Sequence, residues 1–221
     1  MALGGALVVA GIVIIAVPLV GTWLRGHADD QALRDWNSGG ASALAGAAPS
    51  SDPGPQTGAT PLADASPSAT AAQATPAPCR PNAAPADDYA LVGFPTLAQY
   101  GYSGVAANGD WNTLHQRSMV HYSASPAPGA QGNAIVAFHR EPHYEHIDQL
   151  HVGDAVTVQD RSCMVFTYRV TERWTLPPDK VTQLTATGGH DLTLITCTPW
   201  WRDNERIVWR ATLVEPSPAA H

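Results

Sequence analysis

Residues 192–199 read LTLITCTP and form the strongest strand pattern in the chain. β-Branched and apolar residues favour an extended strand, and alternation places Ile195 and Cys197 on one face and Leu194 on the other. Pro199 cannot donate a ladder hydrogen bond, so the strand stops just after the cysteine. We therefore expect the Cys197 thiol at a strand end beside a loop, where a rigid scaffold can present a reactive group.

Similar short runs surround this stretch, from about residue 89 to residue 215. They are rich in Val, Ile, Thr and aromatic residues and are separated by turn residues, a pattern typical of strands. Helical periodicity is scarce, with short turns expected at 144–150 and 178–184. Many short strands favour a closed barrel over a sandwich, because closure removes exposed edges. The clearest strands are expected at 134–138, 155–158, 164–170, 192–196 and 207–214.

Two further runs bring ionisable residues to strand ends. Residues 132–140 read GNAIVAFHR, so an apolar strand ends at His139. A lone histidine in such a place is most often a surface or hydrogen-bonding residue, and a partner is needed to give it a functional role. Residues 205–210 read ERIVWR, and if this strand forms a hairpin with the strand of Cys197, Arg206 lies near the thiol.

Together these runs resemble the sortases. In that family a histidine follows a Gly-Asn-apolar strand, a Thr-Leu-x-Thr-Cys strand carries the nucleophile, and an arginine opens the next strand before an apolar pair. The matching segments here are GNAIVAFHR, LTLITCTP and ERIVWRATLV, and the segments HYSASPAPGAQGN and IDQLHVGD also resemble the family framework. The resemblance covers nearly all of residues 89–215, and its overall look is closest to the class D and E sortases of actinobacteria.

The resemblance implies an eight-stranded β-barrel with short helices over residues 88–215, and a cysteine transpeptidase of the Gram-positive cell surface. Cys197 would be the nucleophile, His139 the proton-transfer partner and Arg206 the positive group at the reacting carbonyl. The family cleaves an LPxTG-like or LAxTG-like sorting motif between Thr and Gly through a thioester. It joins the protein to an amine of a peptidoglycan precursor or a pilin. No cofactor or metal is implied.

Two features differ from many relatives and concern substrate preference. Phe138 stands where many have glycine, and the Trp200-Trp201 pair is bulkier than common. The tryptophans could line a substrate groove or complete a core. Other arginines near the strand ends compete with Arg206 for the cationic role, although none matches the family position; they are Arg140, Arg202 and Arg210. We expect Arg140 to orient the histidine loop.

The segment before the barrel divides in two. Residues 2–24 contain no charge, and at about 1.5 Å per residue they reach roughly 34 Å, enough for a hydrocarbon core of about 30 Å. We predict a single-pass transmembrane anchor over 1–24 with an extracellular catalytic domain; a cleaved signal peptide is the alternative, but the usual basic segment is missing. The Ala, Pro, Gly and Ser composition of 25–87 predicts a disordered linker. Residues 216–221 would be a tail.

The net charge and the number of cysteines narrow the classes of function that remain. The net charge is -7 and no Lys/Arg run occurs, so nucleic-acid binding is set aside. Three cysteines leave at least one thiol outside any internal disulfide. Cys79 and Cys163 are taken as structural, although a bond between Cys163 and Cys197 would make the domain a noncatalytic surface-binding module. A secreted cysteine peptidase would use the same thiol and imidazole.

One local cluster suggests an alternative metal site. Four histidines fall close together in the sequence, with two glutamates nearby. Pro142 interrupts helical spacing there and His139 is expected at a strand end, so the four rings should not converge as a tetrahedral zinc set. The four histidines are His139, His143, His146 and His151.

Overall fold

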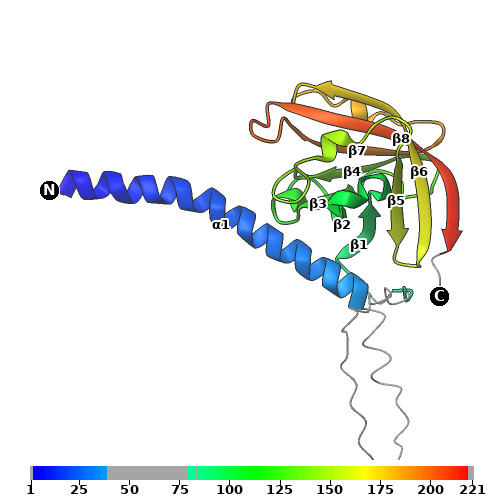
Figure 1. Cartoon of the computed structure of the whole chain (residues 1–221), viewed down its shortest axis with the longest axis horizontal. Coiled ribbons are helices and arrows are strands. Elements are labelled where there is room, and N and C mark those ends of the chain that lie inside the picture. Colours follow the sequence, from blue (N-terminus) through cyan, green and yellow to red (C-terminus); the bar gives the residue numbers. More distant parts are fainter. Residues whose placement is uncertain (1, 39–78, 83, 219–221) are drawn as a thin grey trace, which may run out of the picture.

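Eight strands form one closed barrel in the computed structural model, which describes residues 2–38, 79–82 and 84–218 (Figure 1). The order around the barrel is β1-β2-β3-β4-β7-β8-β6-β5, with β2–β3 and β4–β7 parallel and the other pairs antiparallel. The expected mostly-β eight-stranded barrel is confirmed. The strands are β1 Asp88–Gly93, β2 Ser103–Gly109, β3 Met119–Tyr122, β4 Gly132–Phe138, β5 Ala155–Asp160, β6 Met164–Leu176, β7 His190–Thr198 and β8 Glu205–Pro218.

Helices in the barrel domain are short connections. The two short turns expected at 144–150 and 178–184 are present as η3 and η4, and two others lie between the early strands. Ile147 and Leu150 are both fully buried under the barrel wall, as their spacing predicts. The 3-10 helices are η1 Pro95–Tyr100, η2 Thr113–His115, η3 Ile147–Gln149 and η4 Thr182–Leu184.

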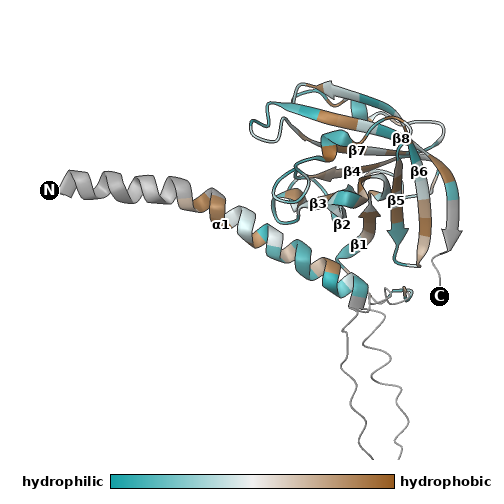
Figure 2. Ribbon diagram, viewed as in Figure 1, coloured by the Kyte–Doolittle hydropathy of each residue, from teal (hydrophilic) through white to brown (hydrophobic). Residues whose placement is uncertain are grey.

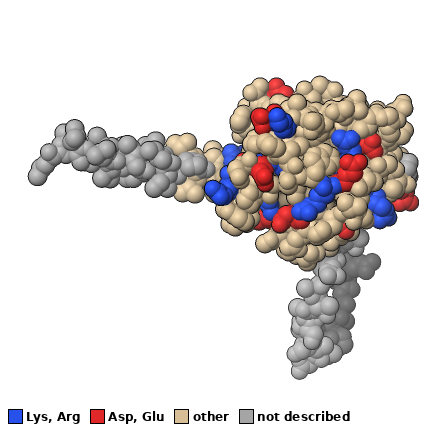
Figure 3. Space-filling model, turned by 90° about the horizontal axis from the view of Figure 1, so that it is seen from above, with Lys and Arg blue, Asp and Glu red and all other residues tan. Residues whose placement is uncertain are grey.

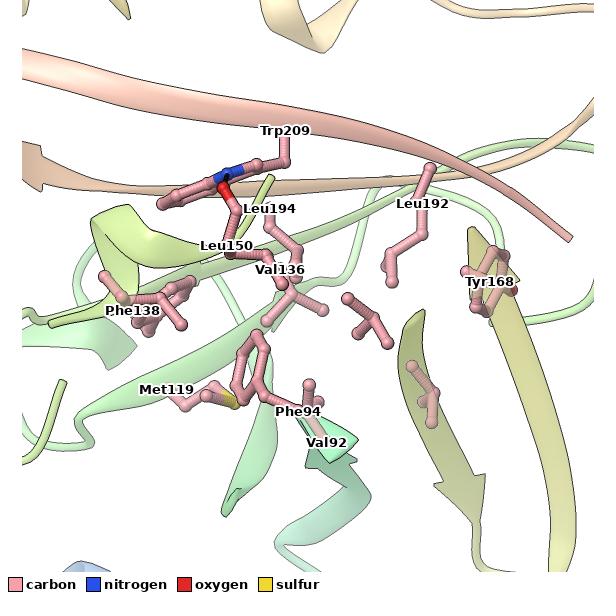
Figure 4. Close-up of a cluster of buried hydrophobic side chains, with 14 of the residues drawn as sticks. Val92, Phe94, Met119, Val136, Phe138, Leu150, Tyr168, Leu192, Leu194 and Trp209 are labelled. Carbon is pink, nitrogen blue, oxygen red and sulfur yellow. Dashed lines mark hydrogen bonds between the residues drawn. The ribbon is translucent and has the colours of Figure 1, made fainter. Parts of the chain in front are cut away.

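The barrel interior holds one continuous apolar cluster (Figure 4). Leu192 and Leu194 of β7 point into it beside Val136 of β4 and Trp209 of β8, as strand alternation requires. Trp209 is fully buried, and its indole Nε1 donates a hydrogen bond to the carbonyl of Leu150 at 2.8 Å. Each such side chain stabilises the fold by roughly 1.5–3 kcal/mol through burial.

The outer face of β4, β7 and β8 is also covered. Ala137, Ile195 and Val208 form a second buried cluster there with Leu176, and Leu114 of η2 packs against it. β7 is therefore buried on both faces, and its buried threonines have hydrogen-bond partners: Thr193 Oγ1 donates to Asn133 Oδ1 at 2.6 Å and Thr196 Oγ1 donates to the carbonyl of Phe138 at 2.6 Å. This outer face is where the site described below is found.

All five predicted strands are confirmed, but three strands were missed. β2 reads SGVAANG, whose glycines and alanines have low strand propensity, and β3 is only four residues long. β6 and β8 extend well beyond the predicted limits because they pair with each other along most of their length. Pairing between distant segments, not local composition, sets these boundaries.

The N-terminal helix α1, Ala2–Ser38, is longer than predicted. Residues 25–38 are helical, so the prediction that the disordered linker begins at residue 25 is wrong. The reason is tertiary: Ala32 and Trp36 are buried against Val105, and the Trp36 indole donates to Gln159 Oε1 at 3.0 Å. Its C-terminal part lies against β1 and β2, and it becomes more hydrophilic toward that end (Figures 1 and 2). The rest of the expected linker, 39–78, lies outside the described residues.

The predicted transmembrane anchor lacks support from the structure. Among the residues that could be searched, no helix is both long enough and apolar enough to cross a membrane.

A disulfide joins Cys79 to Cys163, which are 84 residues apart in the sequence. The alternative pairing of Cys163 with Cys197 is therefore wrong, and Cys197 is a free thiol. Next to the bridge, Asn82 N donates to the carbonyl of Arg161 at 2.6 Å. The described residues 79–82 and 84–87 thus lead into the barrel along the β5–β6 turn and are not a free linker.

Charges are mixed on the surface. On the face shown in Figure 3, acidic and basic side chains are interspersed. A partly buried ion pair joins Arg117 to Asp88 at 2.7 Å and ties the start of β3 to β1.

Candidate active site

The parallel pairing of β4 and β7 places His139 beside Cys197. Ala137 is the direct partner of Ile195, and each of the two functional residues lies two positions further along its own chain. Because side chains alternate along a strand, all four residues belong to the same outer face. His139 stands just after the end of β4, and Cys197 is the last residue but one of β7.

The antiparallel pairing of β7 and β8 adds Arg206. Cys197 and Arg206 are direct cross-strand partners, so their side chains leave the sheet on the same side. Arg206 Nη1 donates to the carbonyls of Asp203 and Glu205, both at 3.0 Å. These bonds hold part of the guanidinium against the β7–β8 loop and leave its charge next to the thiol.

A cavity of about 420 Å³ is lined by all three residues. Ala137 and Ile195 also line it, and further walls come from η2 and from the β6–β7 connection that carries Val181. Cys197, His139 and Arg206 are each half-buried there. The residues that the sequence singled out as nucleophile, proton carrier and cation are therefore brought together at one concave surface.

The Cys197 thiol has a raised pKa. Burial is the main cause, and the negative charges of Asp203 and Glu141 add to it. The positive charges of Arg206 and Arg140 oppose the increase. The surroundings therefore favour the neutral thiol, with Arg206 as the strongest electrostatic support for the thiolate.

The His139 imidazole has a lowered pKa, also mainly because of burial. Its Nε2 lies 2.8 Å from the carbonyl oxygen of Leu114, which can only accept, so Nε2 carries a proton. That bond favours the imidazolium, whereas the positive charges of Arg25 and His115 disfavour it. Nδ1 is consequently the atom that can gain and lose a proton.

Arg140 joins the histidine loop to the end of the cysteine strand. Its side chain is 3% exposed and pairs with Asp148 at 2.6 Å. It also donates to the carbonyl of Glu145 at 2.7 and 3.1 Å and to Thr198 Oγ1 at 3.0 Å. The prediction that Arg140 orients the loop is in accord with these contacts, which additionally fix the backbone just after Cys197.

The positions that differ from the family pattern have separate roles. The Phe138 side chain lies in the barrel interior, near the rings of Phe94 and Tyr144, and the residue also borders the cavity (Figure 4). Trp200 and Trp201 are 46% and 66% exposed in the β7–β8 loop and contact each other edge to face. Neither tryptophan completes the core.

Two of the four clustered histidines point to different partners. His139 contacts the Leu114 carbonyl, while the His146 ring stacks on Tyr100 at 4.9 Å. No group of three metal-binding side chains gathers within the part of the chain that the structure describes. The other two arginines that competed with Arg206 do not line the cavity; Arg202 is exposed and Arg210 donates to the carbonyl of Gln183 at 3.2 Å.

Sequence reasoning missed the groups that α1 and η2 bring to His139. These are Arg25 and Asp29 of α1 and Leu114 and His115 of η2. One signal was available for the helix, because residues 25, 29, 32 and 36 follow the spacing of a single helical face. Nothing local marks residues 113–115 as a cover for the site.

Comparison with known proteins agrees with this geometry. The sortase-domain family model matches residues 98–214, more than half of the chain. Among solved structures, a sortase D5 transpeptidase from Clostridium perfringens is 26% identical with a TM-score of 0.51, over 58% of this chain and 80% of that one. Sortase C1 from Streptococcus agalactiae is also 26% identical, with a TM-score of 0.53, over 59% of this chain and 69% of that one.

A sortase E variant from Streptomyces avermitilis has the same fold, with 24% identity and a TM-score of 0.52 over 60% of this chain and 91% of that one. No curated protein sequence matches the chain. The matched structures include a sortase D and a sortase E, in line with the resemblance seen in the sequence. The chain belongs to the sortase family of cysteine transpeptidases.

Proposed function

We propose that Cys197, His139 and Arg206 carry out transpeptidation on a surface protein that ends in a sorting signal of the LPxTG or LAxTG type. The observation that carries the assignment is the cavity of about 420 Å³ lined by all three side chains. The first half-reaction cleaves the bond between Thr and Gly. The second joins the threonine carbonyl to an amine of a peptidoglycan precursor or a pilin.

In the first half-reaction the Cys197 thiolate attacks the threonine carbonyl carbon and forms a carbon–sulfur bond. Arg206, directly opposite Cys197 in the sheet, stabilises the developing oxyanion or holds the substrate backbone. The tetrahedral intermediate then expels the glycine amine. The His139 imidazolium gives its Nδ1 proton to that amine, and a thioester on Cys197 remains.

In the second half-reaction the acceptor amine attacks the thioester carbonyl. Neutral His139 takes the proton of the amine at Nδ1, the carbon–sulfur bond breaks, and the thiolate returns. The new product is an amide. Water in place of the amine would give the acid that a cysteine peptidase produces.

The protonation states limit the rate. With ordinary pKa values, thiolate and imidazolium coexist in only about one per cent of molecules at pH 7 if they are uncoupled. Burial raises the pKa of Cys197 and lowers the pKa of His139, so the reactive pair becomes scarcer still. Binding of substrate beside Arg206 is the step that can compensate.

We also propose that the barrel is held outside the cell by a single-pass anchor formed by residues 1–24. The absence of charge from 2 to 24 supports an anchor. The disulfide between Cys79 and Cys163 supports an oxidising compartment, since such bonds persist mainly in exported proteins. If the anchor exists, the full chain should stay in the membrane fraction after alkaline carbonate washing. If the barrel lies outside, protease added to intact cells should cleave it. Complete release by the wash would refute the anchor.

The decisive test of the activity is mass spectrometry of the full chain mixed with a panel of sorting peptides. We expect an acyl adduct on Cys197 with one peptide class, and a ligated product when an amine is added. Cys197→Ala should abolish both, whereas the double variant Cys79→Ser/Cys163→Ser should retain them. Product with the Cys197→Ala protein would refute the assignment, and free acid alone in the presence of amine would identify a peptidase.

A further inference from the structure

One face of the C-terminal part of α1 lies against the barrel domain. Ala32 and Trp36 of this face fix the helix on the barrel through Val105 and Gln159, and Arg25 and Asp29 lie on the same face nearer its N-terminal end. Asp29 is 9% exposed. A carboxylate buried to this extent is costly unless it has a partner, so its contacts are informative.

Asp29 is linked to His139 through Ser118, the residue just before β3. The backbone N–H of Ser118 donates to Asp29 Oδ1 at 3.3 Å, and the carbonyl of Ser118 accepts from His139 N at 2.8 Å. Both hydrogen bonds belong to Ser118, so a shift of the helix moves the backbone that holds the histidine. Asp29 Oδ2 is buried and has no hydrogen-bond partner in the described part of the chain.

The helix also touches the loop that follows His139. Gly26 is buried, and a Cβ placed there would lie 3.5 Å from His143 Nε2 and 3.8 Å from Pro142 Cγ. The helix backbone is therefore in near contact with the loop, three and four residues beyond His139. A Cβ at this position would be in ordinary van der Waals contact with the loop.

Charged groups reach His139 from three sides. From α1, Arg25 disfavours the imidazolium and Asp29 favours it; from η2, His115 disfavours it and the Leu114 carbonyl favours it. Across the cavity lie Cys197 and Arg206. The two helix residues thus act on the imidazole in opposite directions. Asp29 itself has a raised pKa because of burial, opposed by Ser118, His143 and Arg117.

We propose that Asp29 is a positioning residue for His139, acting through Ser118, and that docking of α1 residues 25–36 on the barrel completes the active site. The proposal rests on the proposed proton-transfer role of His139. It makes α1 more than a connection to the barrel, because the helix supplies the acceptor for the Ser118 N–H and two charges that act on the histidine in opposite directions.

Three variants of the full chain separate these effects. Asp29→Asn keeps an acceptor for Ser118 N–H but removes the charge, so the pKa of His139 should fall. Arg25→Gln removes the opposing charge, so the pKa should rise. Each shift should be on the order of half a pH unit. Asp29→Ala removes the acceptor as well and should lower kcat about tenfold at the pH optimum. Asp29→Asn should retain most of the kcat of the unchanged protein.

The readout is NMR titration of the His139 ring, assigned by comparison with His139→Gln, together with the acid limb of the pH–rate profile. Exposed Asp30 provides the control, since Asp30→Asn should move neither. Opposite shifts for Arg25→Gln and Asp29→Asn would support the proposal. Unchanged titration in both, shifts in the same direction, or an equal shift for Asp30→Asn would overturn it. The NMR titration measures the effect of Arg25 and Asp29 on His139 even if no transpeptidation is found. The role proposed for Asp29 and the proposed transpeptidase activity can therefore fail separately. Thermal unfolding of each variant checks that it is folded.

Discussion

Cys197 of β7 and Arg206 of β8 are direct partners in an antiparallel pair, and both line the same cavity. Arg206 is also the strongest positive influence on the thiol. One cross-strand pair therefore combines the sulfur with the group that can stabilise charge on its substrate.

Replacement of Arg206 should affect both the transition state and the thiol. We expect Arg206→Ala to lower kcat by about 10²–10³, the usual cost of losing one oxyanion donor, and Arg206→Lys to restore only part of it. The pKa of Cys197 should rise further, so alkylation of the thiol should require a higher pH. Arg202→Ala, which changes an exposed arginine of the β7–β8 loop, is the matched control. Equal losses for the two variants would contradict a specific role for Arg206.

The pH dependence follows from the two shifted groups. The reactive form needs a protonated His139 and a deprotonated Cys197, while both groups are neutral between their pKa values. kcat/KM should therefore rise with pH up to the lowered pKa of His139, stay nearly level, and fall above the raised pKa of Cys197. The acid limb should lie below the ordinary histidine value of about 6.5. A pH profile of kcat/KM whose two limbs lie between the ordinary pKa values of histidine and cysteine would contradict this prediction. It would show that the site does not disfavour the imidazolium and the thiolate.

Removal of Arg140 should destabilise the fold and disturb the cysteine strand. Its buried guanidinium satisfies the Glu145 carbonyl and Thr198 Oγ1, so Arg140→Ala leaves polar groups without partners. We expect a loss of about 2–4 kcal/mol in the free energy of unfolding, measured with denaturant. Exposed Arg173, which donates to the carbonyl of Asp148, offers a comparison, and Arg173→Ala should cost less than about 0.5 kcal/mol. If Arg140→Ala lowers the free energy of unfolding no more than Arg173→Ala does, water must replace the hydrogen bonds of the Arg140 guanidinium.

The disulfide should contribute stability without chemistry. Closing a loop between residues 84 positions apart predicts that Cys79→Ser/Cys163→Ser lowers the free energy of unfolding by about 2–5 kcal/mol. Neither cysteine lines the cavity, so transpeptidation at 25 °C should persist. A reducing agent should lower the Tm of the unchanged protein but not of the double variant. Lost activity with unchanged Tm would place the bridge in the mechanism instead.

Local pattern predicted most of the functional strands. The runs around Ala137, Ile195 and Val208 contain enough β-branched and apolar residues to mark β4, β7 and β8 without any partner. The strands that were missed, β1 to β3, are short or rich in glycine and alanine, and they form because neighbouring strands pair with them. The same dependence on partners explains why β6 and β8 were predicted too short.

The helix was mispredicted for a related reason. Residues 25–38 are polar enough to look like the start of a linker, yet their buried face is spaced for a helix and is stabilised by contact with β1 and β2. Likewise, an odd number of cysteines indicated a free thiol but not which one. The bond between Cys79 and Cys163 requires two segments that only the fold brings together.

By itself, the sequence determined the β class, the strand ends that bear Cys197, His139 and Arg206, and the family resemblance, because these depend on residue type and short spacing. Tertiary structure alone decided the register that places Ala137 opposite Ile195 and Cys197 opposite Arg206. It also decided that the charges of Arg25 and Asp29 act on His139. Strand register and the contact of α1 with the barrel depend on pairing and packing between segments, which no local preference encodes; they follow from closing the barrel and burying one face of α1 against it.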